Sequence, residues 1–171
     1  MDIHVCSLSR LAETARLVRP ARLLSVLSAF PLQRPDGIAA EDHLHIAMGD
    51  ITAAMEGQVL PCAAHVESIL DFARGWRRDA PLLVHCYAGI SRSTAAAYAI
   101  ACALAPERAE DDIARELRTA SPSATPNTLI VEIADAQLRR QGRMVAAIRA
   151  IGRGADAFEG TPFRLGLGAP R

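Results

Sequence analysis

The sequence contains no lysine, because all 19 of its basic residues are arginine. Schiff-base chemistry on lysine and phosphate binding by a P-loop lysine are therefore excluded. The arginines are balanced by 19 acidic residues, and aromatic residues make up only 4%, so the chain lacks the basic surface that nucleic acids and anionic membranes require. We expect neither nucleic acid nor a membrane as a partner.

Long hydrophobic runs are also missing. No stretch of 18 or more apolar residues occurs, and residues 1–9 show no basic region followed by a long apolar segment. The sequence therefore predicts a cytoplasmic protein without a membrane span or a secretory signal. The four cysteines (Cys6, Cys62, Cys86 and Cys102) have neither C-x-x-C spacing nor the Cys/His spacing of a zinc site. We expect free thiols, no metal and no cofactor.

Apolar residues make up half of the 171 residues, which is enough to build the core of one domain. Short apolar runs predict strands at residues 2–6, 22–27, 43–48 and 81–86. Helical spacing and propensity predict helices at residues 9–18, 61–76, 93–104, 106–120, 127–140 and 142–151. This order of elements predicts an α/β fold, with a central, mostly parallel sheet of about four to five strands flanked by helices on both faces.

The end of the chain differs in composition from the rest. Glycine occurs five times in residues 152–171, and two prolines follow from Pro162 on. The sequence therefore predicts a folded domain over residues 1–151 and a poorly ordered Gly/Pro-rich tail over residues 152–171.

The most informative segment reads VHCYAGISRS, residues 84–93. In it, Cys86 follows a histidine, a glycine comes three residues later, and Arg92 comes six residues later with Ser93 directly after it. Cys102 and Arg108 have the same six-residue spacing, but that pair lies at a helix end, contains Pro106 and has no glycine, so it cannot wrap around an anion in the same way. The full pattern singles out Cys86.

A loop between a buried strand and a helix points successive backbone N–H groups into one concavity, where the helix N-terminus adds positive charge. The predicted phosphate-binding residues are therefore those of the loop: Tyr87, Ala88, Gly89, Ile90, Ser91 and Arg92. Arg92 can hold two phosphoryl oxygens, and Gly89 permits the tight turn. The loop N–H groups and the positive charge of Arg92 also favour a nucleophilic thiolate at Cys86. Ser93 can donate a hydrogen bond to that thiolate, and we expect His85 to orient the loop rather than act as a base.

At these residues the sequence resembles the Cys-based protein tyrosine phosphatase superfamily, whose signature is H-C-x5-R-[S/T]. The sequence of the loop is most similar to the dual-specificity branch, especially its small bacterial members. The resemblance extends over roughly residues 22–140 and includes the segments HLHIAMGD and LRTASPSATPN. It implies a metal-independent phosphate monoester hydrolase that forms a phospho-cysteine intermediate. Protein phosphotyrosine is the implied substrate, with phosphoserine, phosphothreonine or a small phosphorylated metabolite as alternatives.

The mechanism that the resemblance implies also needs a carboxylic acid to protonate the leaving oxygen. Asp50 is the favoured candidate because it directly follows the strand predicted at residues 43–48, whereas Asp42 and Asp36 precede that strand. Asn127 resembles a family asparagine that braces the phosphate loop, or it caps the helix that begins there. Tyr87 either faces the substrate or is a partly buried ring, and the second reading is favoured.

Two other classes of function remain at this point. A catalytically weak phosphatase-like module would capture phosphorylated partners with the same anion site, although the intact Cys86, Arg92 and Ser93 count against it. A sulfur-transfer enzyme of rhodanese type also uses a loop cysteine, but it would not need the Arg-Ser pair.

Overall fold

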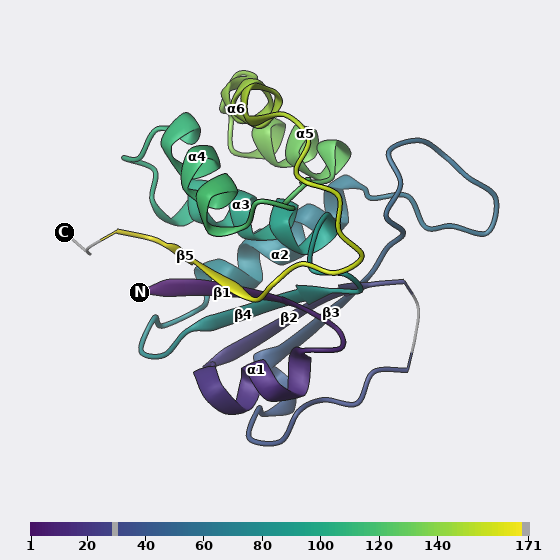
Figure 1. Cartoon of the computed structure of the whole chain (residues 1–171), viewed down its shortest axis with the longest axis vertical. Helices are drawn as coiled ribbons and strands as arrows, with labels where there is room; N and C mark the ends of the chain where they lie inside the picture. The colour runs from purple at the N-terminus through teal and green to yellow at the C-terminus, as the bar shows by residue number, and fades with distance from the viewer. Residues whose placement is uncertain (29–30, 169–171) are drawn as a thin grey trace.

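The computed structural model describes residues 1–28 and 31–168, which form a five-stranded sheet covered by helices on both faces (Figure 1). The strands are β1 (Asp2–Ser7), β2 (Arg22–Leu27), β3 (His43–Ala47), β4 (Leu82–Cys86) and β5 (Phe163–Gly166). The helices are α1 (Leu11–Val18), a short 3-10 turn η1 (Ala40–Asp42), α2 (Ala63–Arg74), α3 (Arg92–Leu104), α4 (Glu110–Ala120), α5 (Thr128–Gln137) and α6 (Arg143–Ile151).

The sheet has the strand order β3-β2-β4-β1-β5, with β5 antiparallel and the other four strands parallel. β4 lies in the middle, and all five of its residues are buried, as expected for a strand covered on both faces. Parallel strands end at the same edge, so the residues that follow β1, β3 and β4 meet at one side of the molecule. The predicted mostly parallel α/β sheet is confirmed.

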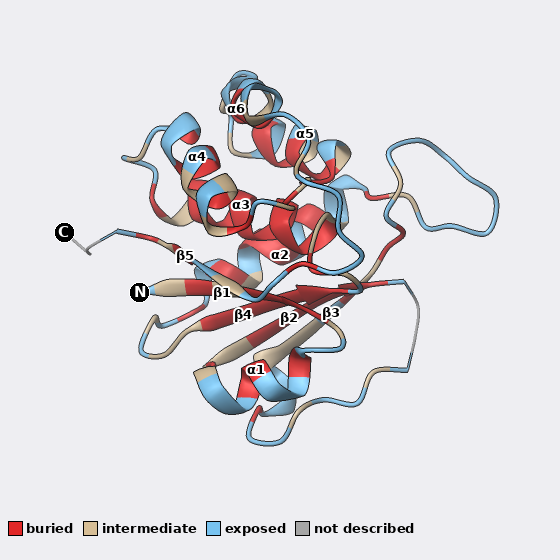
Figure 2. Ribbon diagram, in the orientation of Figure 1, coloured by how far each residue is buried: buried red, intermediate tan, exposed pale blue. Residues whose placement is uncertain are grey.

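The two faces of the sheet are covered unequally. Of the α-helices in the described part of the chain, α1 alone lies on one face, where Leu11 and Ala15 pack with Leu23 and Leu83 in a small cluster (Figure 1). The larger core lies on the other face, with α3 at its centre (Figure 2). Residues 92–102 of α3 are all buried, which the run of small alanines permits because neighbouring elements can approach its backbone closely.

The predicted helices are present with adjusted ends. Arg10, not Ser9, occupies the N-cap position of α1, and Pro61 lies one residue before the Cys62 N-cap of α2. Residues 106–109 precede α4 instead of forming its first turn. Local propensity fixes the existence of these helices better than their first residues, since Arg10 and Ala109, the N-caps of α1 and α4, make no side-chain cap hydrogen bond and so leave no cap signal in the sequence.

The tail prediction differs from the structure. Phe163–Gly166 form β5, which pairs antiparallel with β1, and Leu165 is fully buried. The hydrogen-bond partners of this short strand lie about 160 residues earlier in the chain, so its local composition, rich in glycine and proline, gave no sign of them. The part of the predicted tail from residue 169 on lies outside the described residues.

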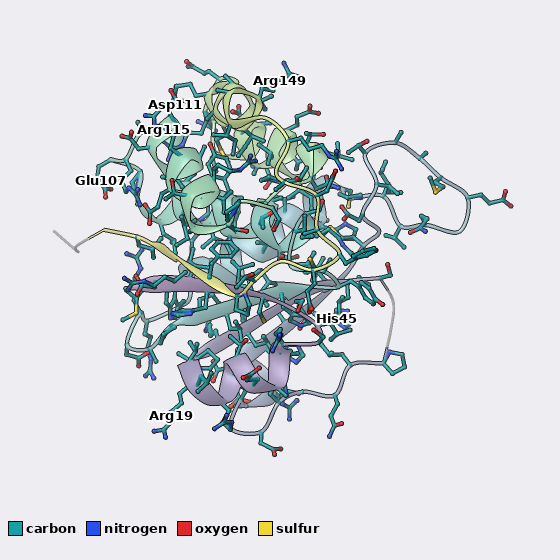
Figure 3. The ribbon with its side chains drawn as sticks, in the orientation of Figure 1. Arg19, His45, Glu107, Asp111, Arg115 and Arg149 are labelled. Carbon is teal, nitrogen blue, oxygen red and sulfur yellow. The ribbon has the colours of Figure 1, made fainter. Side chains whose placement is uncertain are left out.

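Charged side chains of the late helices point away from the sheet. Asp111 and Arg115 of α4 and Arg149 of α6 extend from the outer surface of the helical layer (Figure 3). No helix in the described part of the chain has the length and apolar character that crossing a bilayer requires.

Candidate active site

The loop predicted to bind phosphate (residues 87–92, the phosphate loop) connects the carboxyl end of β4 to the first turn of α3. Four of its carbonyl groups accept hydrogen bonds from backbone N–H groups outside the loop: Tyr87 from Leu8 (3.0 Å), Ala88 from Gly160 (2.8 Å), Ile90 from Thr125 (2.9 Å) and Ser91 from Asn127 (3.4 Å). With its carbonyls bonded outward, the loop can turn its N–H groups toward its own centre, the arrangement that binds an anion.

Gly89 makes the tight curvature of the loop possible. Its φ is +70°, a conformation that L side chains rarely adopt. An added Cβ would also lie 2.9 Å from the backbone carbon of Cys6, at the end of the neighbouring strand β1. Both observations require glycine here.

Cys86 is the last residue of β4 and is only 2% exposed. Its Sγ accepts a hydrogen bond from the Gly89 N–H at 3.2 Å and lies 3.1 Å from the Ser93 Oγ. The Gly89 N–H thus points at the sulfur, and the Ser93 hydroxyl lies within hydrogen-bond distance of it. Cysteines that serve as nucleophiles are surrounded by groups of this kind.

Arg92 is also buried, with 7% of its surface exposed. One of its terminal nitrogens donates to the Met48 carbonyl at 2.8 Å, which ties the arginine to the segment after β3. Its Nε is buried and has no hydrogen-bond partner among the described residues. A buried guanidinium donor without an acceptor is unfavourable unless a ligand supplies one, and the oxygens of a phosphoryl group match its geometry.

Asp50 lies at the rim of the phosphate loop. Its Oδ1 accepts hydrogen bonds from the Ser91 hydroxyl at 2.7 Å and from the Asn127 side-chain amide at 2.9 Å. Asn127 also caps α5, because its Oδ1 accepts from the Ile130 N–H at 3.1 Å. Of the two sequence-based alternatives for Asn127, the helix cap is present, whereas its side-chain amide donates to Asp50 and to the Ile51 carbonyl instead of to the phosphate loop.

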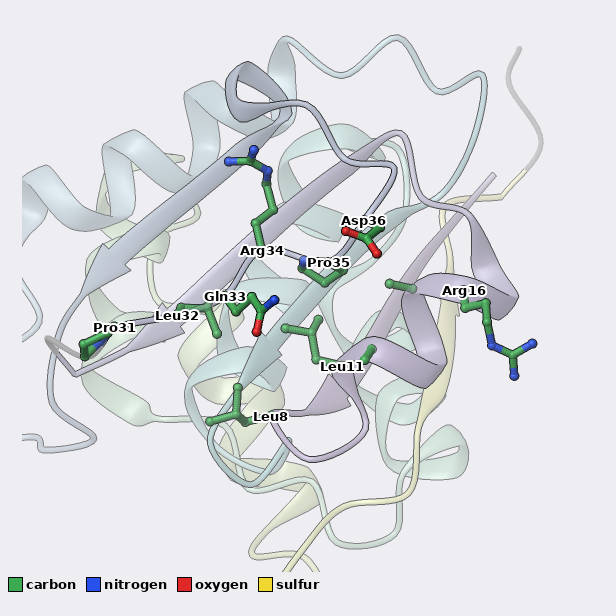
Figure 4. Close-up of a pocket in the computed structure, with 11 residues that line it drawn as sticks. Leu8, Leu11, Arg16, Pro31, Leu32, Gln33, Arg34, Pro35 and Asp36 are labelled. Carbon is green, nitrogen blue, oxygen red and sulfur yellow. The ribbon is translucent and has the colours of Figure 1, made fainter.

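The two competing aspartates lie elsewhere. Asp42 ends η1 just before β3, and its carboxylate forms an ion pair with Arg22, the first residue of β2, at 3.5 Å. That is the amino end of the parallel strands, opposite the phosphate loop. Asp36 lines a hollow of about 670 Å³ between α1 and residues 31–36, together with Leu11 and Leu32 (Figure 4).

The fold that carries this site is known from other proteins, although neither a family profile nor a curated protein sequence matches the chain. The Cydia pomonella PTP-2 phosphatase superposes with a TM-score of 0.62 at 17% identity, covering 80% of this chain and 85% of that one. DUSP15 gives 0.60 at 18% identity, with 86% and 88% covered. Human DUSP28 gives 0.57 at 21% identity, with 80% and 93% covered. The chain has the fold of the dual-specificity phosphatases.

Behind the loop of this dual-specificity phosphatase fold, a hydrogen-bonded chain crosses three strands. His85 Nε2 lies 2.7 Å from the hydroxyl of Ser25, which lies 2.8 Å from Nε2 of His43. Burial lowers the pKa of His85 to about 4, because the charged imidazolium would lose its hydration. The neutral imidazole of His85 thus connects β4 to β2 and β3 through the Ser25 hydroxyl.

The segment between α6 and β5, residues 152–162, lies beside the phosphate loop, a position that the sequence did not predict. It runs past the carboxyl ends of the strands on its way to β5 (Figure 1). Gly160 donates to the phosphate loop, and an added Cβ there would lie 2.8 Å from the Gly89 carbonyl oxygen. The next residue back, Glu159, accepts hydrogen bonds from the hydroxyls of Ser7 and Ser9. A lone Glu-Gly pair in a Gly/Pro-rich stretch carries no signal that could have located it.

Two further side chains lie near the loop. Tyr87 was predicted to be a partly buried ring, but 71% of its surface is exposed, since the loop carbonyls bind outward and leave its ring at the rim. Cys6 is buried beside the loop, and burial raises the pKa of its thiol to about 12.

Within residues 1–28 and 31–168, no three His, Cys, Asp or Glu side chains gather as a metal site would need.

Proposed function

We propose that the chain is a metal-independent phosphate monoester hydrolase that acts on protein phosphotyrosine, alone or together with phosphoserine and phosphothreonine (dual specificity), through a phospho-cysteine intermediate. The observation that carries this proposal is the setting of Cys86, whose Sγ accepts from the Gly89 N–H and lies 3.1 Å from the Ser93 hydroxyl, within the loop that also presents buried Arg92. The dual-specificity phosphatase fold supports phosphatase chemistry in general.

In the first step, the Cys86 thiolate attacks phosphorus in line with the ester oxygen. The S–P bond forms as the P–O bond breaks, and the carboxylic acid of Asp50 gives its proton to the leaving oxygen. Arg92 and the loop N–H groups bind the three equatorial oxygens, where negative charge is spread in the transition state. The products are the free alcohol or phenol and a phosphorylated cysteine.

In the second step, water attacks the phosphorus of that intermediate. Asp50, now a carboxylate, takes a proton from the water, and the P–S bond breaks to release inorganic phosphate. The electron pair returns to sulfur, where the hydroxyl of Ser93, 3.1 Å away, stabilises the departing thiolate. Both steps use one carboxyl group, first as the acid and then as the base.

Phosphotyrosine is favoured over the alternatives for a physical reason. The ring of Tyr87 stands exposed at the rim of the loop, where an aromatic substrate can pack against it. The five residues between Cys86 and Arg92 include no basic side chain, so a highly phosphorylated lipid headgroup would find no extra charge there. Phosphoserine, phosphothreonine and small phosphomonoesters remain substrates to test beside it.

The deciding experiment is hydrolysis of p-nitrophenyl phosphate and a phosphotyrosine peptide near pH 6 in EDTA. We expect turnover by the natural protein and none by Cys86→Ser. Cys62→Ser is the matched control, because Cys62 is exposed and caps α2, far along the chain from the loop. Loss of activity in EDTA would contradict the metal-independent mechanism. Binding of vanadate without any turnover would favour the alternative, a phosphatase-like module that captures phosphorylated partners.

A further inference from the structure

A cleft of about 340 Å³ opens beside the phosphate loop, on the side of β1. Six residues from three parts of the chain line it: Leu8, Ser9, Tyr87, Ala88, Phe158 and Glu159. Two of them are aromatic rings that face solvent, since Tyr87 is 71% exposed and Phe158 is fully exposed. Apolar rings in this position lose hydration when a ligand covers them, which favours binding.

The carboxylate of Glu159 supplies the charge of this cleft. It accepts hydrogen bonds from the hydroxyls of Ser7 and Ser9, and these bonds hold the pKa of Glu159 below its ordinary value, so the group is ionised at neutral pH. The nearby Arg10 is bonded to Glu13 at 3.1 Å. Among the described residues no arginine or histidine forms a salt bridge with Glu159.

This negative charge lies close to the anion site. Ser7, which holds Glu159, is the residue opposite Cys86 in the register of β1 and β4, and Gly160 donates directly to the Ala88 carbonyl. A carboxylate at such a position repels a phosphoryl dianion and weakens its binding. A substrate that carries its own positive group into the cleft removes this penalty, whereas a neutral or acidic substrate does not.

We propose that the cleft is a subsite for an arginine or lysine side chain adjacent to the phosphorylated residue of a protein substrate. The aliphatic stem and the cationic group of such a side chain pack on the faces of Tyr87 and Phe158, and its charge pairs with Glu159. This inference rests on the proposed function for the phosphate site itself. The subsite would make the protein prefer substrates with a basic residue beside the phosphorylated one, a preference that the phosphate loop alone would not give.

The test compares phosphotyrosine peptides that differ only in the residues flanking the phosphotyrosine: arginine, lysine, alanine or glutamate, placed on its N-terminal or its C-terminal side. kcat/KM is measured for the natural protein, and Kd is measured in the Cys86→Ser background, where binding is read without turnover. We expect arginine and lysine peptides to be preferred over the alanine peptide by about fivefold on one side of the phosphotyrosine. The glutamate peptide should be the poorest.

Two variants assign the preference to the cleft. Glu159→Gln should abolish most of the preference for arginine and lysine, and Phe158→Ala should reduce it, while both variants still hydrolyse p-nitrophenyl phosphate because neither side chain belongs to the catalytic machinery. Asp156→Asn is the matched control, since Asp156 is an exposed acid in the same segment that pairs with Arg153 at 2.5 Å. It should leave the preference unchanged.

The outcomes separate this inference from the proposed function. Equal kcat/KM and Kd for the arginine, lysine and alanine peptides would overturn the subsite, as would a preference that survives Glu159→Gln. Selective binding of arginine peptides to Cys86→Ser, together with no hydrolysis of any phosphate ester by the natural protein, would support the subsite and overturn the enzyme. Absence of binding to every phosphopeptide would overturn both.

Discussion

Two exposed carboxylates flank the phosphate loop, and each accepts hydrogen bonds from two side chains. Asp50 is bonded to Ser91, inside the loop, and to Asn127. Glu159 is bonded to Ser7 and Ser9, at the end of β1 and outside the loop. Asp50 is therefore held by the loop itself, which suits the proton donor that we propose, whereas Glu159 is held by β1 and the residues after it, which suits the substrate-selecting role that we propose for it. The same chemical group serves different purposes according to what holds it.

Replacing Asp50 by asparagine gives the largest expected effect on this comparison. Asparagine keeps an oxygen for the hydrogen bonds from Ser91 and Asn127 but cannot donate the proton, so kcat for a phosphotyrosine peptide should fall by about 10²–10⁴-fold. Steady-state kinetics on the peptide and on p-nitrophenyl phosphate would measure it. The second substrate should suffer less, because its phenol leaves more easily without a proton.

The matched substitution on the other side is Glu159→Gln, which should leave kcat for the same peptide within a few-fold of the natural value. Vanadate affinity should be retained in both variants, which shows that the anion site is intact. Equal losses of kcat at Asp50 and Glu159 would refute the division of labour between the two carboxylates.

β5, the strand that follows Glu159 in the chain, is expected to contribute to the stability of the fold. Leu165 of β5 is fully buried against the core, so Leu165→Ala should lower the free energy of unfolding by about 2–5 kcal/mol. Urea denaturation of the full chain would measure the change. Leu17→Ala is the control, because Leu17 on α1 is 66% exposed and its loss should change the free energy of unfolding by less than about 0.5 kcal/mol. A negligible effect at Leu165 would mean that residues 152–168 are an appendage, as composition alone suggested.

The buried His85, which is bonded through Ser25 to His43 on β3, predicts that the stability of the fold depends on pH. In the folded chain the pKa of His85 is lowered from 6.5 to about 4, so below pH 6.5 the unfolded chain binds the proton more readily than the folded one. Stability that is fully present above pH 6.5 should be lost progressively as the pH falls toward 4, by about 3 kcal/mol for this histidine.

The measurement is urea unfolding of the natural protein and of His85→Gln at several pH values from 4 to 7. Glutamine can still bond to the hydroxyl of Ser25 but does not titrate, so the variant should show the shallower pH dependence. The half-buried His43, whose pKa is also lowered by burial, is present in both proteins and contributes in the same direction. Parallel curves for the two proteins would show that His85 is not the group that titrates.

The comparison of the two carboxylates also shows where sequence reasoning succeeded. Cys86, Arg92 and Ser93 lie within one strand-loop-helix unit, so their arrangement follows from local sequence, and Asp50 follows β3 at the edge where parallel strands end together. No local element of the sequence fixes the position of Glu159. Its position depends on the pairing of β5 with β1 across nearly the whole chain and on the close contact of Gly160 with Gly89. Non-local pairings of this kind leave no periodic trace in a short Gly/Pro-rich segment.

The smallest expected effect concerns a substrate without a cation. p-Nitrophenyl phosphate brings no positive charge to the cleft beside Tyr87, so removing the negative charge of Glu159 should relieve repulsion of the dianion. Because Glu159 is exposed and water and salt screen its charge, Glu159→Gln should lower KM by only about twofold, with kcat unchanged. The difference in KM should shrink as NaCl is raised toward 1 M, where charges a few ångströms apart are already screened. A rise in KM would mean that Glu159 supports the loop geometry instead of opposing the anion, and its side of the site would then resemble the Asp50 side after all.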